Sequence, residues 1–111
     1  MSDIDSVAWY FDNAEEKTHE VGLKDQNSLS LYDMAGNLME WCWDYYDDYI
    51  VAEPSNNPTG INEGDERVLR GGYYYDADCY CLCTSRYCDE PAPTNEYSLK
   101  AVGFRLCRYL E

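Results

Sequence analysis

The sequence predicts an α+β domain with a small antiparallel sheet, few helices and long loops. Three observations lead to this class. Runs of alternating apolar residues, typical of strands, are short. Turn-forming Gly, Asn and Pro residues gather between them, mainly over residues 47–66 and 89–98. A single helical stripe opens the chain. We therefore expect one domain over residues 1–111, a common size for one hydrophobic core.

The first expected elements come from the N-terminal third. Residues 3–14 are predicted to form a short helix, because Val7, Ala8 and Phe11 share one stripe and an acidic start suits a helix N-terminus. Residues 29–31 alternate as at the start of a strand. Residues 33–37 are predicted to form a turn, since Gly36 and Asn37 both tolerate left-handed backbone.

Three further strands are expected. Residues 38–46 are aromatic and suit a core strand. Residues 67–70 form a second strand, ended by a Gly-Gly pair. Residues 101–110 close the sheet, with apolar residues alternating from Val102. We expect the side chains of Trp41, Trp43 and Phe104 to lie in the core.

The charge of the chain limits its partners. Asp and Glu number 22 against eight Lys and Arg, a formal net charge of −14. Such a surface repels nucleic acid and anionic membranes. Basic ligands or metal cations are more natural partners, although acidity that only keeps an aromatic-rich domain soluble explains the charge equally well.

The sequence offers little on location or assembly. Its apolar runs are far too short to span a membrane, and residues 1–8 are acidic and lack the apolar centre of a signal peptide. We therefore expect no membrane insertion, and a cytoplasmic location unless the chain is exported or displayed by another route. The oligomeric state stays open.

The most unusual segment lies between two regular frames, Arg70-Gly71-Gly72 and Gly103-Phe104-Arg105. Residues 73–88 hold five tyrosines, four cysteines and two aspartates, a mixture that no helix or strand pattern requires. Tyrosine gives a large, rigid area with a polar tip, and is favoured on binding surfaces. This composition indicates a contact surface held by a scaffold.

The cysteines fit no familiar site. Cys79, Cys81 and Cys83 alternate, so on an extended segment they would point the same way. Zinc sites use paired Cys-x-x-Cys ligands or added histidines, and the only histidine is His19, which we expect at the surface. A disulfide framework has little support without a secretory segment.

Three motifs together resemble a known family. They are residues 31–41 (LYDMAGNLMEW), residues 57–60 (NPTG), and residues 67–72 (RVLRGG) followed by Gly103-Phe104-Arg105. In order and spacing they are similar to the C-terminal half of the formylglycine-generating, sulfatase-modifying enzyme family. The resemblance implies a minimal C-type-lectin-type fold, trimmed relative to the longer family domain.

The resemblance also bears on catalysis. Enzymes of the family use two cysteines at the fourth and ninth residues after the Gly-Gly pair. These positions hold Asp76 and Cys81 here, so one of the two catalytic thiols is missing. We expect no enzymatic activity and no organic cofactor. The alternative is a formylglycine-generating-like thiol oxidase using Cys79 or Cys81 with copper or oxygen, or a degenerate, non-catalytic relative of it.

A second branch of the same fold resembles the chain more closely. Variable proteins of diversity-generating retroelements carry a pattern similar to Arg70-Gly71-Gly72, Cys81, Arg86, Pro91 and Gly103-Phe104-Arg105. Adenine-directed mutation of Asn codons yields Tyr, Asp, Ser, Cys and Leu, which matches the composition here. The resemblance implies a ligand-binding, most simply protein-binding, function with a variable region over residues 73–101.

Ten residues are predicted to contact the ligand, and all lie in the unusual segment. The alternative is core packing for the tyrosines and a solvated face for the acids. The ten are Tyr73, Tyr75, Asp76, Asp78, Cys79, Tyr80, Tyr87, Cys88, Asp89 and Glu90.

The resemblance further implies a structural calcium site at Asp33, Gly36, Leu38 and Glu40. Two carboxylates and two backbone carbonyls in one tight turn are the hard oxygen ligands that calcium prefers. The alternative is an ordinary charged turn. Finally, Arg70, Arg86 and Arg105 are expected to brace the scaffold by pairing with buried carboxylates.

Overall fold

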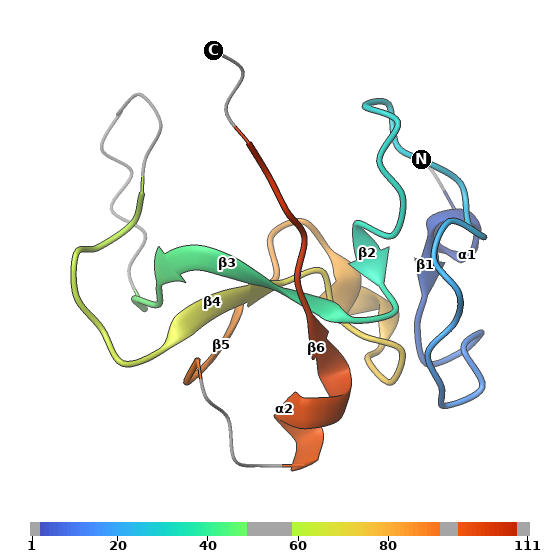
Figure 1. Cartoon of the computed structure of the whole chain (residues 1–111). Helices are drawn as coiled ribbons and strands as arrows, with labels where there is room; N and C mark the ends of the chain where they lie inside the picture. Colours follow the sequence, from blue (N-terminus) through green and yellow to red (C-terminus); the bar gives the residue numbers. More distant parts are fainter. Residues whose placement is uncertain (1–2, 49–58, 92–95, 109–111) are drawn as a thin grey trace.

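The computed structural model describes residues 3–48, 59–91 and 96–108 (Figure 1). Its elements are short and joined by long loops, as the sequence predicted. In chain order they are α1 (Ile4–Val7), β1 (Ala8–Trp9), β2 (Ala35–Gly36), β3 (Met39–Tyr45), β4 (Arg67–Arg70), the 3-10 turn η1 (Asp78–Cys81), β5 (Tyr87–Asp89), α2 (Glu96–Ala101) and β6 (Val102–Gly103).

A four-stranded sheet with the order β5-β4-β3-β6 forms the centre. The pairs β3–β4 and β4–β5 are antiparallel, but β6 runs parallel to β3. The sheet is therefore mixed, where an antiparallel one was predicted. The reason is α2, which turns the chain so that β6 enters beside β3 in the same direction (Figure 1).

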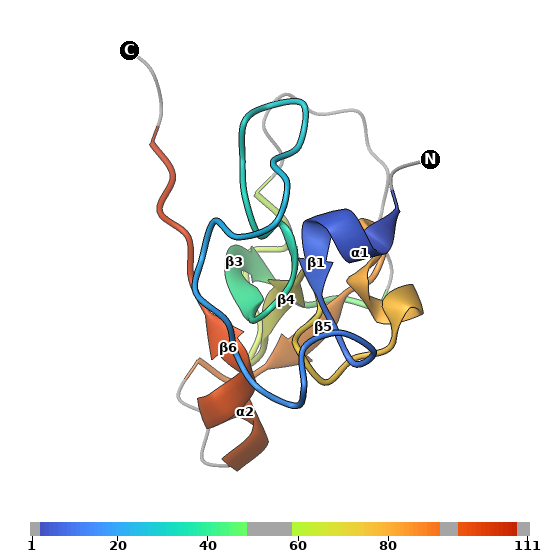
Figure 2. The same cartoon turned by 90° about the vertical axis from the view of Figure 1, so that its right-hand side faces the viewer.

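A second, two-stranded sheet pairs β1 with β2 in parallel. It lies next to α1 at one side of the larger sheet, on the right in Figure 1 and toward the viewer in Figure 2. The pairing brings residues 8–9 onto residues 35–36, and the amide of Asn37 donates to the carbonyl of Trp9 at 2.7 Å. The N-terminal segment is thus tied to the turn that leads into β3.

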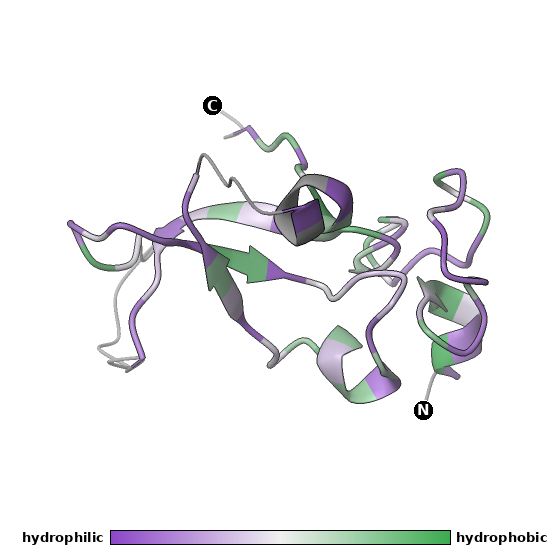
Figure 3. Ribbon diagram, turned by 90° about the horizontal axis from the view of Figure 1, so that it is seen from below, coloured by the Kyte–Doolittle hydropathy of each residue, from purple (hydrophilic) through white to green (hydrophobic). Residues whose placement is uncertain are grey.

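Two small hydrophobic clusters hold the domain together. The first joins the sheet to α2 and to the start of the unusual segment through buried Met39, Leu69, Tyr73 and Ala101. The second joins Ala8 and Tyr10 to Cys81. Figure 3 shows that the hydrophobic residues gather on the strands, whereas the connecting loops are more hydrophilic. The segment from residue 73 to 81 is therefore anchored at both ends by the core.

Several predicted elements are confirmed. The strands over 38–46 and 67–70 match β3 and β4 closely. The turn at 33–37 has the expected left-handed backbone, with φ of 54° at Asp33, 71° at Gly36 and 65° at Asn37.

Other element predictions were wrong, and side-chain hydrogen bonds explain two of them. The helix over 3–14 ends at Val7, because the Asn13 side chain accepts from the Tyr10 amide and donates to the Ala8 carbonyl, which closes a turn. Residues 29–31 form no strand, since the Asn27 side chain accepts from the amides of Leu29 and Leu31.

The C-terminal predictions also need correction. Among residues 101–108, the described part of the predicted closing strand, only Val102–Gly103 form a strand. The helix α2 begins at Glu96, inside the predicted loop 89–98. Trp43 and Phe104 were predicted in the core, but their side chains are 77% and 75% exposed. Trp43 lies on the outer face of β3 with the Arg67 guanidinium 5.0 Å from its ring centre, and Phe104 follows the end of β6.

Some predictions lie outside the described residues, namely those on Asn57, Pro58 and most of the loop before residue 59. Within the described ranges, the structure contains no helix that is both long and apolar enough to cross a membrane.

Candidate ligand-binding face

The Gly-Gly pair lets the unusual segment fold back onto the domain. Gly71 and Gly72 have φ of 99° and 69°. A Cβ on Gly72 would lie 2.8 Å from the Cys81 sulfur, and one on Gly71 would lie 3.2 Å from the Met34 carbonyl oxygen. Because a side chain at either position would be both strained and crowded, glycine allows the close approach of the two chain segments.

Asp76 builds the turn that begins the segment. Its Oδ2 accepts from the Tyr73 amide at 3.1 Å, and its own amide donates to the Tyr73 carbonyl at 3.0 Å. Its carbonyl accepts from the Phe11 amide at 2.9 Å. Burial raises the pKa of the Asp76 carboxyl, and hydrogen bonds from Tyr73 and Tyr87 oppose this shift. Asp76 is therefore tied into the scaffold rather than displayed.

An exposed face follows this turn. Tyr75 and Tyr80 are 47% and 49% exposed, and Asp78 and Cys79 between them are exposed as well. Phe11, also about half exposed, packs edge-on against Tyr75 with ring centres 5.2 Å apart. We call Phe11, Tyr75, Asp78, Cys79 and Tyr80 the aromatic face. Sequence reasoning missed Phe11, because it assigned the residue to the stripe of a helix over residues 3–14 and not to the contact surface.

The other predicted contact residues are placed differently. Tyr73 is only 9% exposed and belongs to the core cluster with Met39 and Leu69, so it does not contribute to an exposed surface. Tyr87, Cys88 and Asp89 are half-buried in the edge strand β5. Glu90 is exposed just beyond them. Burial, and after it the charge of Asp76, raises the pKa of the Tyr87 hydroxyl.

The cysteines of the unusual segment also differ in burial. All six lie in the described ranges and none forms a disulfide there. Cys79 and Cys83 are exposed, whereas Cys81 is 6% exposed. Burial, reinforced by the charge of Asp76, raises the pKa of the Cys81 thiol to about 11. Cys81 is thus protonated at neutral pH and packed as a small hydrophobic residue.

The turn predicted to bind calcium is engaged by Arg105, which donates to Glu40 and to the Asp33 carbonyl. The guanidinium donates from Nε and Nη2 to the Glu40 carboxylate, at distances from 2.7 to 3.2 Å. The same Nη2 group donates to the carbonyls of Tyr32 at 2.9 Å and Asp33 at 3.3 Å. Arg105 therefore does pair with a half-buried carboxylate, as predicted, and ties the chain after β6 to the turn.

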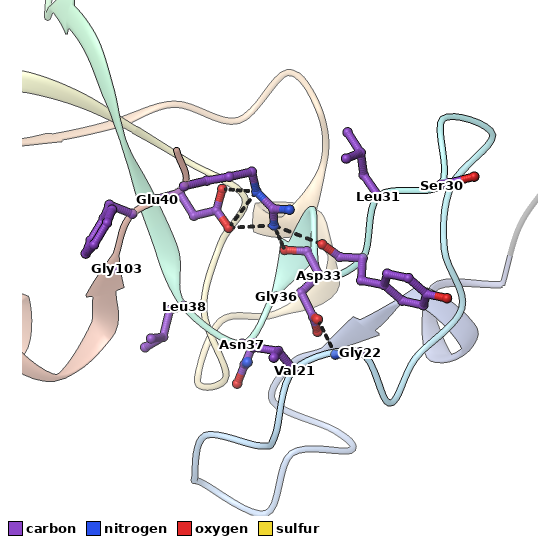
Figure 4. Close-up of a pocket in the computed structure, with 13 residues that line it drawn as sticks. Val21, Gly22, Ser30, Leu31, Asp33, Gly36, Asn37, Leu38, Glu40 and Gly103 are labelled. Atoms are coloured by element: carbon purple, nitrogen blue, oxygen red, sulfur yellow. Dashed lines mark hydrogen bonds and ion pairs between the residues drawn. The ribbon is translucent and has the colours of Figure 1, made fainter. Parts of the chain in front are cut away.

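The Asp33 carboxylate points the other way. Its Oδ2 accepts from the Gly22 amide at 2.8 Å, and its Oδ1 is buried without a hydrogen-bond partner among the described residues. The unpartnered oxygen suits a cation, but the two carboxylates do not face a common point, and both oxygens of Glu40 are taken (Figure 4). The donors as they lie do not fit calcium, which would have to displace Arg105 from Glu40. Calcium at this turn stays a prediction.

No other metal centre is evident in the described part of the chain, where no three His, Cys, Asp or Glu side chains lie close enough to hold an ion. His19, predicted at the surface, is half-buried and stacks on Trp9 with ring centres 3.8 Å apart. Its backbone exchanges hydrogen bonds with the Asn37 side chain at 3.0 and 3.1 Å. His19 is thus part of the scaffold.

Arg70 and Arg86 brace the unusual segment through backbone carbonyls. Arg70 donates to the carbonyls of Cys83 and Ser85, each at 3.0 Å. Arg86 donates to the Asp47 carbonyl at 3.1 Å and lies over the Tyr46 ring. Both brace the scaffold, as predicted, but through carbonyl partners where carboxylates were expected.

Comparison with known proteins agrees with the motifs. The model of the sulfatase-modifying factor enzyme 1-like domain matches residues 4–110. The chain is 39% identical over 80 residues to formylglycine-generating enzyme of Streptomyces coelicolor, covering 71% of this chain and 25% of that protein. It is 40% identical over 85 residues to serine/threonine-protein kinase pkn1 of Chlamydia caviae, covering 74% of this chain and 13% of the kinase.

A solved structure gives the same result in three dimensions. Treponema denticola variable protein 1 superposes with a TM-score of 0.81 and 36% sequence identity, over 91% of this chain and 35% of that protein. The C-type-lectin-type fold predicted from the motifs is confirmed. The chain spans about a third or less of the length of these similar proteins.

Proposed function

The chain belongs to the sulfatase-modifying factor enzyme 1-like family, and from this premise we propose that it is a non-catalytic variable protein whose aromatic face binds a protein ligand. The sequence of residues 73–101 would be diversified by a retroelement, and the scaffold would stay constant. The similarity to a variable protein of Treponema denticola over most of the chain supports this assignment.

One observation carries the proposal. Within the unusual segment, some tyrosines and cysteines are exposed while others are buried in the core. Tyr75, Asp78 and Tyr80 are exposed, whereas Tyr73 and Cys81 are buried. An exposed cluster of aromatic residues marks a binding surface, since tyrosine buries a large area on association at a small entropy cost. Half-exposed positions outside the core clusters also tolerate substitution, which a diversified surface requires.

The thiol oxidase alternative rests on family membership and on Cys81. Against it, Asp76 occupies the position of the first family thiol. Two hydrogen bonds with Tyr73, one of them through its carboxylate, hold a turn there, and a third joins its carbonyl to the Phe11 amide. Cys81 is buried, with a thiol pKa of about 11, so the nucleophilic thiolate is scarce at neutral pH. Both observations favour binding without chemistry.

A pair of displayed libraries tests the proposed function. One library randomises the aromatic face at Tyr75, Asp78, Cys79 and Tyr80. The control randomises four exposed positions of the loop before β4, at Asn62, Glu63, Asp65 and Glu66. Both are selected against the same panel of folded proteins. We expect binders from the first library only, with the melting temperature kept. Equal yields from both libraries would refute a dedicated face.

The enzyme alternative is tested directly on the purified chain. A cysteine-containing peptide is incubated with the protein, copper and oxygen, and aldehyde formation is followed by mass spectrometry. We expect no product above the level of Cys81→Ser. Aldehyde that forms with the wild type and disappears with Cys81→Ser would establish the oxidase instead.

A further inference from the structure

A pocket lies beside the segment that carries the aromatic face. Its volume is about 730 Å³, within the usual range for small-ligand sites. One wall is the loop from Asp25 to Leu31, and another is formed by Cys81, Leu82 and Cys83. The remaining lining residues are Val7, Asp33, Met34, Ala35, Arg70 and Gly71. We call this space the side pocket.

Hydrogen bonds fix both walls. The Asp25 amide donates to the Ser6 carbonyl at 2.8 Å, and the Asn27 amide donates to the Leu31 carbonyl at 2.9 Å. On the other wall, the Ser85 amide donates to the Leu82 carbonyl at 3.0 Å, and Arg70 holds the carbonyl of Cys83. The hollow is therefore a formed feature and not a gap between loose loops.

The lining is mainly apolar and accessible. Leu31, Met34 and Leu82 are 38%, 46% and 55% exposed. Three large apolar side chains around one hollow leave unfavourable contact with water that a ligand would relieve. Leu82 belongs to the variable region, whereas Leu31 and Met34 belong to the scaffold, so variation could alter one wall while the other stays constant.

The charges of the lining favour a cation. The lining includes two acidic residues, Asp25 and Asp33, and one basic residue, Arg70. Arg70 is engaged by two carbonyls. Asp33 has a buried oxygen with no hydrogen-bond partner in the described part of the chain. This oxygen is too enclosed for a ligand to donate to it directly, but a cation in the pocket would lower the cost of the nearby negative charge.

From this lining we propose that the side pocket takes a lysine or arginine side chain of the protein ligand. The apolar stem would pack on Leu31, Met34 and Leu82, and the charged end would pair with Asp25 and Asp33. Long basic side chains commonly bury their stem in this way while the charge finds a partner. This inference rests on the proposed function, and it names the chemistry that the partner presents.

The overall charge supports the same partner. With a net charge of −14, the chain attracts basic protein surfaces and repels acidic ones. An anionic side chain would meet Asp25 and Asp33 at close range. A purely apolar side chain would fill the volume but leave the charges of Asp25 and Asp33 without a counter-charge.

Two small molecules of matched length test the proposal. Pentylammonium mimics the lysine side chain, and hexanoate has a similar apolar chain with the opposite charge. Each is titrated into the ¹⁵N-labelled whole chain in calcium-free buffer at pH 7, and amide chemical shifts are recorded. We expect pentylammonium to shift the amides of residues 25–35 and 81–83 in a saturable way, with millimolar affinity. Hexanoate should leave them unchanged.

Charge variants distinguish binding in the side pocket from general attraction of the cation to the acidic surface. Asp25→Asn with Asp33→Asn should weaken pentylammonium binding at least tenfold. The side-chain amide oxygen that the second substitution introduces can still accept from the Gly22 amide, so the turn is kept. The control, Glu63→Gln with Asp65→Asn, removes two exposed charges from another loop and should bind like the wild type.

Three results would overturn the proposal: no saturable shifts with pentylammonium, equal shifts with hexanoate, or equal weakening in both double variants. None of these would bear on the aromatic face, which the library selection tests separately. Conversely, failure of the libraries with a saturable pentylammonium site would contradict the proposed function and leave the cation pocket standing.

Discussion

Tyr73 and Tyr75 are two residues apart, yet they belong to different parts of the molecule. Tyr73 packs in the core against Met39, Leu69 and Ala101. Tyr75 lies on the aromatic face, in contact with Phe11. The same contrast separates buried Cys81 from exposed Cys79. The unusual composition therefore marks the segment as a whole, whereas burial decides which of its residues are available to a ligand.

The contrast between the tyrosines gives the largest expected effect. Tyr73→Ala should destabilise the domain by about 3 kcal/mol or more, because it leaves a cavity in a small core. Tyr75→Ala should cost about 1 kcal/mol or less, since it removes a half-exposed ring and one edge contact. Chemical denaturation of both variants measures this, and equal losses would mean that the two tyrosines do not differ in role.

Loss of the Arg105–Glu40 pair, which belongs to the scaffold and not to the aromatic face, should cause the next largest loss of stability. Arg105→Gln removes hydrogen bonds to Glu40 and to two carbonyls, and leaves a half-buried carboxylate without its partner. We expect a loss of about 1–3 kcal/mol. Arg105→Lys should recover only part, because an ammonium cannot reproduce the bidentate geometry. A melting temperature unchanged in Arg105→Gln would contradict the bracing role.

Calcium provides a second test of Arg105→Gln against the wild type, since the ion would compete with Arg105 for Glu40. If calcium binds at Asp33 and Glu40, it should raise the melting temperature of Arg105→Gln more than that of the wild type. The check is differential scanning fluorimetry in calcium and in chelator. A melting temperature that responds to calcium in neither protein would remove the calcium prediction.

Thiol labelling compares the exposed and buried cysteines. At pH 8, iodoacetamide should modify Cys79 and Cys83 at least tenfold faster than Cys81, which is buried and has a thiol pKa of about 11. Peptide mass spectrometry over time gives the rates. Comparable labelling of Cys81 would show that it is reactive, and would revive the oxidase alternative.

The smallest effect concerns the half-buried Asp76. Its folded-state pKa is raised by burial, so the folded state binds its proton more tightly than the unfolded state. Its contribution to stability is therefore greatest at low pH and is lost as pH rises through the folded pKa. Asp76→Asn should gain stability relative to wild type, by about 1 kcal/mol or less, between pH 3 and pH 7. A relative loss over that range would reverse this sign.

The sequence predicted the fold class, the strands at 38–46 and 67–70, the left-handed turn and the family resemblance. These depend on local features: apolar alternation, glycine and asparagine conformations, and motif spacing. Pairing of Arg105 with a carboxylate was also predicted, although not with Glu40 by name, because the chain holds many more acidic than basic residues.

The sequence did not predict where Trp43, Phe104 and Tyr73 lie. Alternation shows which residues share a face but not whether that face is covered. Phe11 was missed for the same reason, since its exposure depends on Asp76 holding the N-terminal segment from a distance in sequence. The short helix and absent strand follow from the side chains of Asn13 and Asn27, which compete with the backbone pattern.

Population sequencing of the gene tests the central claim most directly. If the aromatic face is a diversified binding surface on a constant scaffold, substitutions should concentrate at Tyr75, Asp78, Cys79 and Tyr80. Gly71, Gly72, Arg86 and Gly103 should stay unchanged, and so should the core residues Met39 and Leu69. A uniform sequence across the population, or substitutions spread evenly over buried and exposed positions, would contradict the account.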